Sequence, residues 1–171
     1  MKRAFLLVIS FCILFSCSSD DNRIFEIDNE LDFIIPGGLN LIETHFFPVN
    51  NVPTLWNAYL NNNGFSEDQL GDILPVRASI ESRFGQDLNF IDRVSVWMYD
   101  TSFENGREIF YMDPVDLGSK TEIELFSNIA ELSELITQGN VLIELRLTLR
   151  NITATSTDLR LRTNYAVFPI E

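Results

Sequence analysis

The sequence predicts an all-β domain, an antiparallel sandwich of about seven or eight strands with one or two short helices in its connections. Three observations predict this fold. Apolar and polar residues alternate in many segments, turn-forming residues separate most of these segments, and helical periodicity is limited to two short stretches. Because strands do not alternate regularly with helices, a doubly wound α/β fold is excluded.

The last two expected strands, 141–150 and 158–168, show the alternation most clearly. The odd positions of 141–150 are aliphatic throughout, whereas the even positions include Glu144, Arg146 and Arg150. Successive side chains of a strand point to opposite faces, so the odd positions should face the core. The polar stretch between the two segments is expected to be their connecting loop.

The remaining strands are expected to be shorter or less regular. They are 24–34, 39–47, 76–84, 93–99, 107–112 and 121–126. The Pro-Gly-Gly sequence at 36–38 is a strong turn signal between the first two. Two stretches, 54–63 and 128–139, are expected to be helical, and in the second Asn128 can cap the start while Gly139 ends the helix.

The first residues are typical of a secretory signal peptide. Lys2 and Arg3 precede 4–16, an uncharged run of 13 residues. A membrane-spanning helix needs about 20 apolar residues, whereas the apolar part of a signal peptide needs only about 7–15 behind a basic start. Residues 1–16 are therefore expected to be a signal that is cleaved.

The residues that end this run, from Leu14 to Cys17, resemble the lipobox of bacterial lipoproteins. The resemblance implies that the signal is removed before Cys17 and that the thiol of Cys17 is acylated. Phe15 is bulkier than the residue usually found at its place in the motif, and an ordinary signal peptide is the alternative. The expected organisation is a signal at 1–16, a lipidated tether at 17–23 and a sandwich domain at 24–171.

The tether begins with two serines and two aspartates, residues 18–21. This stretch is similar to the short acidic signal that directs Bacteroidetes lipoproteins to the outside of the outer membrane. The resemblance implies a lipid-anchored protein of the outer membrane, displayed at the cell surface. The periplasmic face of that membrane is the alternative location, since a solvated spacer can also be acidic.

The body of the chain also resembles a group of Bacteroidetes lipoproteins that have an immunoglobulin-like sandwich. The shared features are the lipobox, first strands that end in the turn at 36–38, a short helix near 128–136 and two long closing strands. The resemblance implies an immunoglobulin-like β-sandwich. It implies no particular activity.

The net charge and the cysteine content exclude several kinds of partner and site. The formal net charge is −13, and removal of Lys2 and Arg3 with the signal would lower it to −15. Nucleic-acid binding needs Lys and Arg to neutralise phosphates, so a nucleic-acid partner is not expected. The two cysteines are Cys12, in the signal, and Cys17. The domain itself therefore offers no disulfide, thiolate zinc site or cysteine nucleophile.

Catalysis is not expected from the residues present. His45 is the single histidine and the natural general base, and no G-x-S-x-G sequence accompanies it. His45 falls on an expected strand, which favours a structural or surface role. No phosphate-binding glycine loop or other cofactor motif is present, so no cofactor is expected. A hydrolase remains the least favoured function.

Metal binding has weak candidates only. The chain has no H-E-x-x-H and no EF-hand sequence. Calcium prefers six to eight oxygen ligands, and acidic residues flank two neighbouring expected loops. The candidates are Asp100, Glu104, Asp113 and Asp116.

Aromatic residues are the most informative candidates for binding. Trp97 and Tyr99 share the face opposite the core on one expected strand, and Trp56 and Tyr59 lie in an irregular connection. Exposed rings on a sandwich can stack on sugars, unless a helix or loop covers them as a second small core. The sequence favours a non-catalytic binding or accessory lipoprotein with a protein or glycan partner. The alternative is a structural envelope lipoprotein without a small-molecule ligand.

Overall fold

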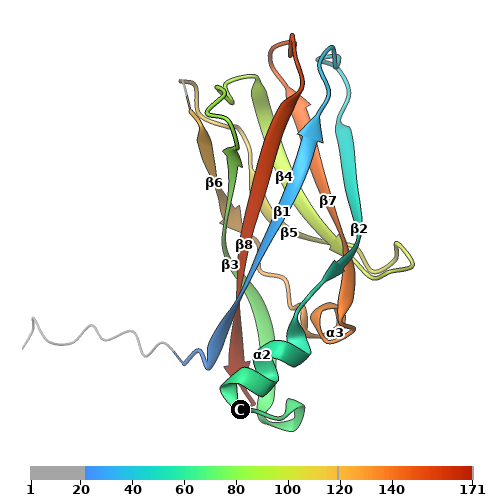
Figure 1. Ribbon diagram of the computed structural model, residues 1–171, viewed down its shortest axis with the longest axis vertical. Coiled ribbons are helices and arrows are strands. Elements are labelled where there is room, and N and C mark those ends of the chain that lie inside the picture. The colour runs from blue at the N-terminus through green and yellow to red at the C-terminus, as the bar shows by residue number, and fades with distance from the viewer. Residues whose placement is uncertain (1–21, 119, 171) are drawn as a thin grey trace, which may run out of the picture.

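The computed structural model describes residues 22–118 and 120–170. Its sheet has eight strands, which curve into two layers (Figure 1). The strands are β1 (Phe25–Ile35), β2 (His45–Pro53), β3 (Leu70–Ser82), β4 (Ile91–Tyr99), β5 (Arg107–Met112), β6 (Glu122–Ser127), β7 (Asn140–Leu149) and β8 (Thr157–Pro169). Two short helices, α2 (Trp56–Asn63) and α3 (Ser133–Ile136), and a single 3₁₀ turn (Glu67–Gln69) lie in the connections. The strand pairs are antiparallel, which confirms the all-β prediction.

The pairing of the strands is nested. The first strand pairs with the last, β1 with β8, and the pairs β2–β7, β3–β6 and β4–β5 follow inward. The pairs β3–β8 and β4–β7 then join these ribbons into two groups of four, with the order β1-β8-β3-β6 and β5-β4-β7-β2. We call them the β1 half and the β2 half. A short pairing between β5 and β6 connects the halves into one sheet.

This order differs from the immunoglobulin-like order that the resemblance implied. In an immunoglobulin domain the first two strands are neighbours in one sheet. Here β1 and β2 lie at opposite ends of the strand order, and each pairs with a strand from the end of the chain. Alternation along a strand says which face is buried and does not say which strand lies beside it.

The core lies between the two halves and is built from the inward positions that alternation predicts. On β8 these positions include Leu159, Leu161 and Tyr165, and on β4 they include Val94 and Val96, all almost fully buried. Burial raises the pKa of the Tyr165 hydroxyl above its ordinary value. With about 25 cal/mol gained for each Å² of apolar surface buried, this core is the main source of stability.

Three segments depart from the expected boundaries. Strand β3 begins at Leu70 and not at 76, because a bulge after Pro75 lets the strand continue through a residue that has no amide hydrogen to donate. The first turn of the expected helix 128–139 is extended, since the Leu132 amide donates to the Ile73 carbonyl, and only Ser133–Ile136 is helical. The expected strand 39–47 overlaps β2 only at 45–47, because residues 40–43 form a turn in which Asn40 Oδ1 accepts from the amides of Ile42 and Glu43, and β2 continues to Pro53. The expected helix at 54–63, by contrast, agrees with α2, which ends at Gly64 in the left-handed conformation.

The two ends of the sandwich carry different connections (Figure 1). The loops β1–β2, β3–β4, β5–β6 and β7–β8 lie at one end, and α2, α3 and the C-terminal residues lie at the other. The described chain enters at this second end, where the Ile24 amide donates to the Val167 carbonyl at 2.8 Å. The expected signal peptide and Cys17 lie outside the described residues. Among the residues described, no helix is long and apolar enough to cross a membrane.

Candidate functional site

A row of side chains runs across the outer surface of the β2 half and onto β6, the strand of the β1 half that pairs with β5. Starting from β6, the register places Phe126 opposite Tyr111, Tyr111 opposite Ser95, Ser95 opposite Arg146 and Arg146 opposite Phe46. We call these five residues the aromatic row. Each belongs to a different strand, in the order β6-β5-β4-β7-β2, so the row depends on the assembled sheet and not on any one segment.

Ser95 lies at the middle of the row, and its small side chain leaves a hollow above it. Larger residues surround it on four sides: Arg93 and Trp97 along β4, and Arg146 and Tyr111 on the neighbouring strands. The hollow has a volume of about 530 Å³. It is lined by Thr44, Arg93, Val94, Ser95, Trp97, Glu108, Tyr111, Asp113, Arg146 and Thr148. We call it the Ser95 hollow.

The exposed rings of this face are aligned with the row. Phe126 is 59% exposed, Phe46 is 56% exposed and Tyr111 is 37% exposed. The centroids of Tyr111 and Phe126 are 6.0 Å apart. The Arg146 guanidinium lies 5.4 Å from the centroid of Phe46 and 4.0 Å from that of Trp97. These are distances at which a cation is attracted to a ring face.

Trp97 and Tyr99, which the sequence singled out, do lie side by side, but they are not equally accessible. Trp97 is half-buried and its indole N–H donates to the Ser95 hydroxyl at 3.1 Å, so it forms one wall of the hollow. Tyr99 is only 8% exposed, because Phe103 of the β4–β5 loop stacks on it at 4.5 Å between centroids. Tyr99 is thus covered by a loop, whereas Trp97 faces the hollow.

A buried carboxylate fixes the position of Arg146. Glu144 is 4% exposed, and its carboxylate accepts a hydrogen bond from the Arg146 Nε at 2.7 Å. The Tyr99 hydroxyl bridges the same two side chains. Burial, followed by the charge of Glu144, raises the pKa of the Tyr99 hydroxyl, so this group stays a neutral donor at ordinary pH. Arg146 is therefore held rigidly against the rings on both sides of it.

The lining of the Ser95 hollow is electrically balanced although the chain is strongly acidic. Two arginines, Arg93 and Arg146, face two acids, Glu108 and Asp113. Arg93 pairs with Asp113 at 3.2 Å. Among the residues that the structure describes, Glu108 makes no side-chain hydrogen bond or ion pair, which leaves its carboxylate free to accept hydrogen bonds.

Trp56 and Tyr59 belong to a different part of the molecule. Trp56 is 2% exposed and its indole N–H donates to Glu67 at 2.9 Å, so it cannot stack on a ligand. Both rings pack against Phe25 at centroid distances of 6.2 Å, forming a second small core under α2. The sequence pattern placed them in an irregular connection and did not reveal that α2 turns them inward.

The four calcium candidates do not converge. The Asp100 carboxylate accepts hydrogen bonds from the amides of Ser102 and Glu104 and from Asn105, and these donors lower its pKa, the backbone bond at Glu104 most of all. Asp113 pairs with Arg93, and Asp116 pairs with Lys120 at 3.2 Å. Among the described residues, no group of three or more His, Cys, Asp and Glu side chains could hold a metal ion.

His45 lies at the start of β2, where its Nε2 is 2.8 Å from the carbonyl oxygen of Asn40. Asn40 also caps its own loop, since its Oδ1 accepts from the amides of Ile42 and Glu43. This contact is a local one, within a single strand-to-strand connection. It gives His45 a structural role in the β1–β2 loop.

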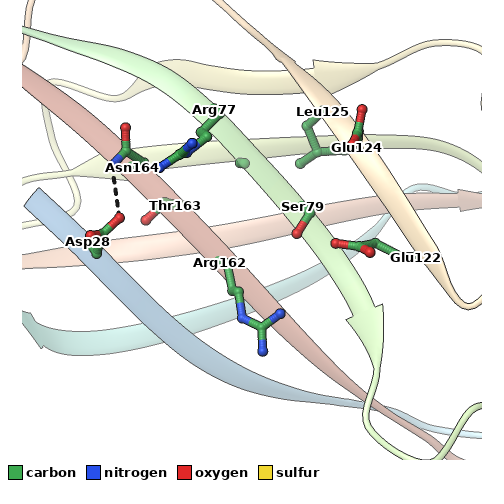
Figure 2. A pocket seen from close by; sticks show the side chains of 10 residues that line it. Asp28, Arg77, Ser79, Glu122, Glu124, Leu125, Arg162, Thr163 and Asn164 are labelled. Carbon is green, nitrogen blue, oxygen red and sulfur yellow. Dashed lines mark hydrogen bonds between the residues drawn. The ribbon is translucent and has the colours of Figure 1, made fainter. Parts of the chain in front are cut away.

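A second hollow, on the outer face of the β1 half, is built in the same way around Ser79 (Figure 2). Ser79 lies opposite Arg162 on one side and opposite Glu124 on the other, and Arg162 in turn lies opposite Glu30. The hollow has a volume of about 510 Å³. Its lining is Asp28, Arg77, Ala78, Ser79, Glu122, Glu124, Leu125, Arg162, Thr163 and Asn164, with no aromatic ring. We call Glu30, Arg162, Ser79 and Glu124 the charged row.

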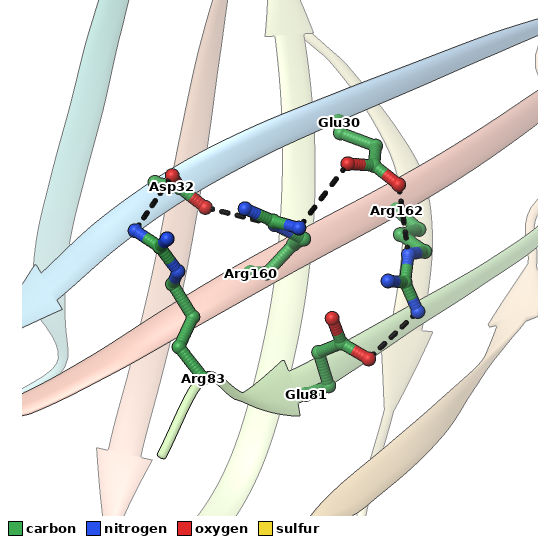
Figure 3. Close-up of polar contacts among 6 residues, drawn as sticks. All are labelled: Glu30, Asp32, Glu81, Arg83, Arg160 and Arg162. Carbon is green, nitrogen blue, oxygen red and sulfur yellow. Dashed lines mark hydrogen bonds and ion pairs between the residues drawn. The ribbon is translucent and has the colours of Figure 1, made fainter.

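Ion pairs link the charged row to its neighbours (Figure 3). Arg162 bridges Glu30 at 2.9 Å and Glu81 at 2.7 Å, and Arg160 bridges Asp32 at 3.0 Å and Glu30 at 3.4 Å. The side chains of these groups are from 25% to 54% exposed. Such solvated pairs shape the surface but contribute little to stability.

Phe46, Tyr111 and Phe126 were not singled out from the sequence, although a signal for them exists. Each lies at one of the alternate positions whose side chains point outward from its strand, and the same alternation identified Trp97. What the sequence lacks is the register between strands. Only the register shows that these rings and Arg146 form one line.

Comparison with known proteins does not indicate a function for this chain. No protein-family model matches the chain, and no curated protein matches it. Among solved structures, the cyanophage Pam1 capsid asymmetric unit is 9% identical with a TM-score of 0.36, covering 88% of this chain and 90% of that one. A marine algae virus of the order Picornavirales is 13% identical with a TM-score of 0.35, covering 91% and 78%. These scores are too low for the likeness to indicate a function.

Proposed function

We propose that this chain is a non-catalytic binding module, anchored in the outer membrane through Cys17, displayed at the cell surface and binding a glycan at the Ser95 hollow. The observation that carries the proposal is the hollow itself. A ring wall from Trp97 and Tyr111, a fixed arginine and a free carboxylate converge on a small polar floor. Binding sites for small molecules commonly combine apolar walls with a few placed polar groups.

The chemistry of the lining fits a sugar. The rings of Trp97 and Tyr111 offer surface for the apolar faces of a pyranose. Ser95, Thr148 and Glu108 can exchange hydrogen bonds with hydroxyl groups. The two arginines are already paired with Glu144 and Asp113, so an anionic ligand would have to displace an existing partner. A neutral saccharide needs no such exchange.

The proposed location rests on the resemblance of residues 14–21 to a lipobox and an acidic export signal. The described chain enters the fold beside the C-terminal residues (Figure 1). A tether from Cys17 would therefore attach at this end, leaving the loops of the opposite end and the aromatic row away from it. Protease shaving of intact cells, with a C-terminal tag and a periplasmic control protein, would separate surface display from the periplasmic face.

We also propose a jelly roll as the finer fold class, in place of an immunoglobulin-like sandwich. The nested pairs β1–β8, β2–β7, β3–β6 and β4–β5 support it, because a jelly roll is an eight-stranded double sheet made of two Greek keys. Jelly rolls serve many unrelated functions, among them capsid and lectin domains. The fold class therefore adds nothing to the glycan proposal.

A structural envelope protein that contacts only other proteins is the second candidate. The observation that favours it is a set of apolar side chains at the loop end of the sandwich. Ile42 is 92% exposed, Leu117 is 81% exposed and Phe84 is 72% exposed, each in a different loop. Apolar groups gathered at one end are typical of protein contacts.

Binding of neutral saccharides to the purified domain, measured by calorimetry, tests the leading proposal. We expect Trp97→Ala to weaken binding about tenfold, because it removes a wall of the hollow and about 1.4 kcal/mol of contact. Phe84→Ala, which removes an exposed ring in the β3–β4 loop, is the matched control and should bind as wild type does. Glu108→Gln tests the hollow without removing a packed ring. Equal binding by all four proteins would contradict the proposal.

A further inference from the structure

We infer that the ligand is an extended neutral oligosaccharide that lies across the strands along the whole aromatic row, from Phe126 to Phe46. This inference rests on the proposed function and deepens it, because it assigns the length and direction of the ligand. The Ser95 hollow is its central subsite, and the rings at the two ends of the row are its outer subsites.

The length follows from the register. The row crosses five adjacent strands without a break, and each neighbouring pair lies directly opposite. Four steps of about 4.8 Å between neighbouring strands give a row of about 19 Å. A single sugar ring fills only the hollow above Ser95. A chain of several sugars is needed to reach both Phe46 and Phe126.

The exposure of the end rings supports the same conclusion. Phe46 and Phe126 are both more than half exposed on a face where the central rings are partly covered. Phe126 leans on Tyr111, and Phe46 lies over the fixed Arg146, so each end ring has a neighbour that restricts its position. Rings that are held in place and exposed can stack on a ligand with little loss of side-chain entropy.

The alternation of chemistry along the row favours a saccharide over a protein partner. Rings at Phe126 and Tyr111 are followed by the hydroxyl of Ser95, the guanidinium of Arg146 and the ring of Phe46. Thr44 and Thr148 add hydroxyl groups beside the hollow. A protein interface would instead have a continuous apolar centre. An extended sugar chain presents apolar faces and hydroxyl groups by turns.

The charge of the lining favours a neutral chain over an anionic one. Arg93 and Arg146 are balanced by Asp113 and Glu144, and Glu108 is free. A carboxylate or sulfate on the ligand would be repelled by Glu108 and would have to compete for the arginines. Neutral hexose and pentose polymers meet neither obstacle.

The test uses calorimetry with cello-, xylo- and manno-oligosaccharides, from the monosaccharide to the hexasaccharide, on the wild-type domain. We expect affinity for one of these series to rise with length until the row is filled. Phe46→Ala and Phe126→Ala should each weaken binding of the hexasaccharide about five- to tenfold, yet change binding of the disaccharide less than about twofold. Trp97→Ala should weaken both. Urea unfolding of each variant checks that the fold is retained.

The outcomes separate the two proposals. If the hexasaccharide binds no better than the disaccharide, or if the end variants weaken both equally, the extended row is wrong while the Ser95 hollow stands. If no saccharide of any length binds, both the inference and the proposed function are wrong. If an anionic oligosaccharide binds in place of the neutral ones, the charge argument is overturned.

Discussion

The charged row of the β1 half and the aromatic row of the β2 half occupy equivalent places in the fold. Each runs from an edge strand through the neighbouring long strand to a serine, and then to the next strand. An arginine precedes the serine in both, Arg162 before Ser79 and Arg146 before Ser95. A hollow of about 500 Å³ lies above each serine. The two halves therefore share one arrangement, in which an arginine and a serine on neighbouring strands lie beside a hollow.

The difference lies in what flanks each arginine. Arg162 is flanked by Glu30 and by Glu81, which satisfy it in contact with water. Arg146 lies between the rings of Phe46 and Trp97, and its single carboxylate partner is buried. A ligand at the charged row would have to replace solvated ion pairs, whereas one at the aromatic row covers ring surface that water does not satisfy. On the binding proposal, the side chains added to this common arrangement, and not the arrangement itself, make the aromatic row the proposed binding face.

Removing each arginine should give the largest difference between the two rows. Arg146→Ala leaves the Glu144 carboxylate buried without its partner, and we expect a loss of about 3 kcal/mol in the free energy of unfolding. Arg162→Ala breaks only solvated pairs, and the expected change is close to the error of a urea titration. Equal losses for the two variants would show that the rows do not differ in burial as argued. Glu144→Gln combined with Arg146→Ala should recover part of the loss, because the uncompensated charge is gone.

Alternation was enough to predict most of the strands, because one face of each is buried, but it placed the second strand at 39–47, whereas β2 is His45–Pro53 and has few buried residues. The expected strand 141–150 is β7 at Asn140–Leu149, and 158–168 is most of β8. Alternation could not predict that β1 pairs with β8, since this contact joins the two ends of the described chain. The resemblance supplied an immunoglobulin-like order, and the nested pairing is different.

The candidate site was predictable only in part, for the same reason. The alternation of apolar and polar residues along one strand identified the outward face that carries Trp97. The aromatic row depends on the register of five strands. That register includes bulges in the β4–β5 and β4–β7 pairs, which no local sequence pattern predicts. The burial of Trp56, the first residue of α2, against Phe25 was likewise a consequence of tertiary packing.

Filling the two hollows should separate the rows by function. Ser95→Leu places an aliphatic side chain between Trp97, Tyr111 and Arg146, and we expect it to weaken saccharide binding at least about tenfold, or 1.4 kcal/mol. Ser79→Leu fills the other hollow and should leave binding unchanged. Ser95→Leu also removes the acceptor of the Trp97 indole N–H, so Ser95→Gln, which is large and keeps an acceptor, is measured beside it. Loss of binding in Ser79→Leu alone would move the site to the charged row.

The smallest expected effect concerns two aspartates, one held by the charged face and one in the loop that covers Tyr99. The Arg160 hydrogen bond lowers the pKa of Asp32, and backbone amides, first that of Glu104, lower the pKa of Asp100. Because both pKa values lie below the unfolded value near 3.9, the stabilisation from each is present above that value and is lost as the pH falls through the folded pKa.

Salt should tell these two carboxylates apart. The Debye length falls from about 10 Å at 0.1 M salt to about 3 Å at 1 M, so the pKa of Asp32 should rise toward its ordinary value in high salt. The pKa of Asp100 should stay low, since its donors are backbone amides of its own loop that are fixed in position. NMR titration of the carboxyl carbons at the two salt concentrations measures both groups in one sample, and Arg160→Gln should reproduce the effect of salt on Asp32 only. If salt raises the pKa of both aspartates equally, the contrast between a face held by solvated ion pairs and a loop held by backbone hydrogen bonds is wrong.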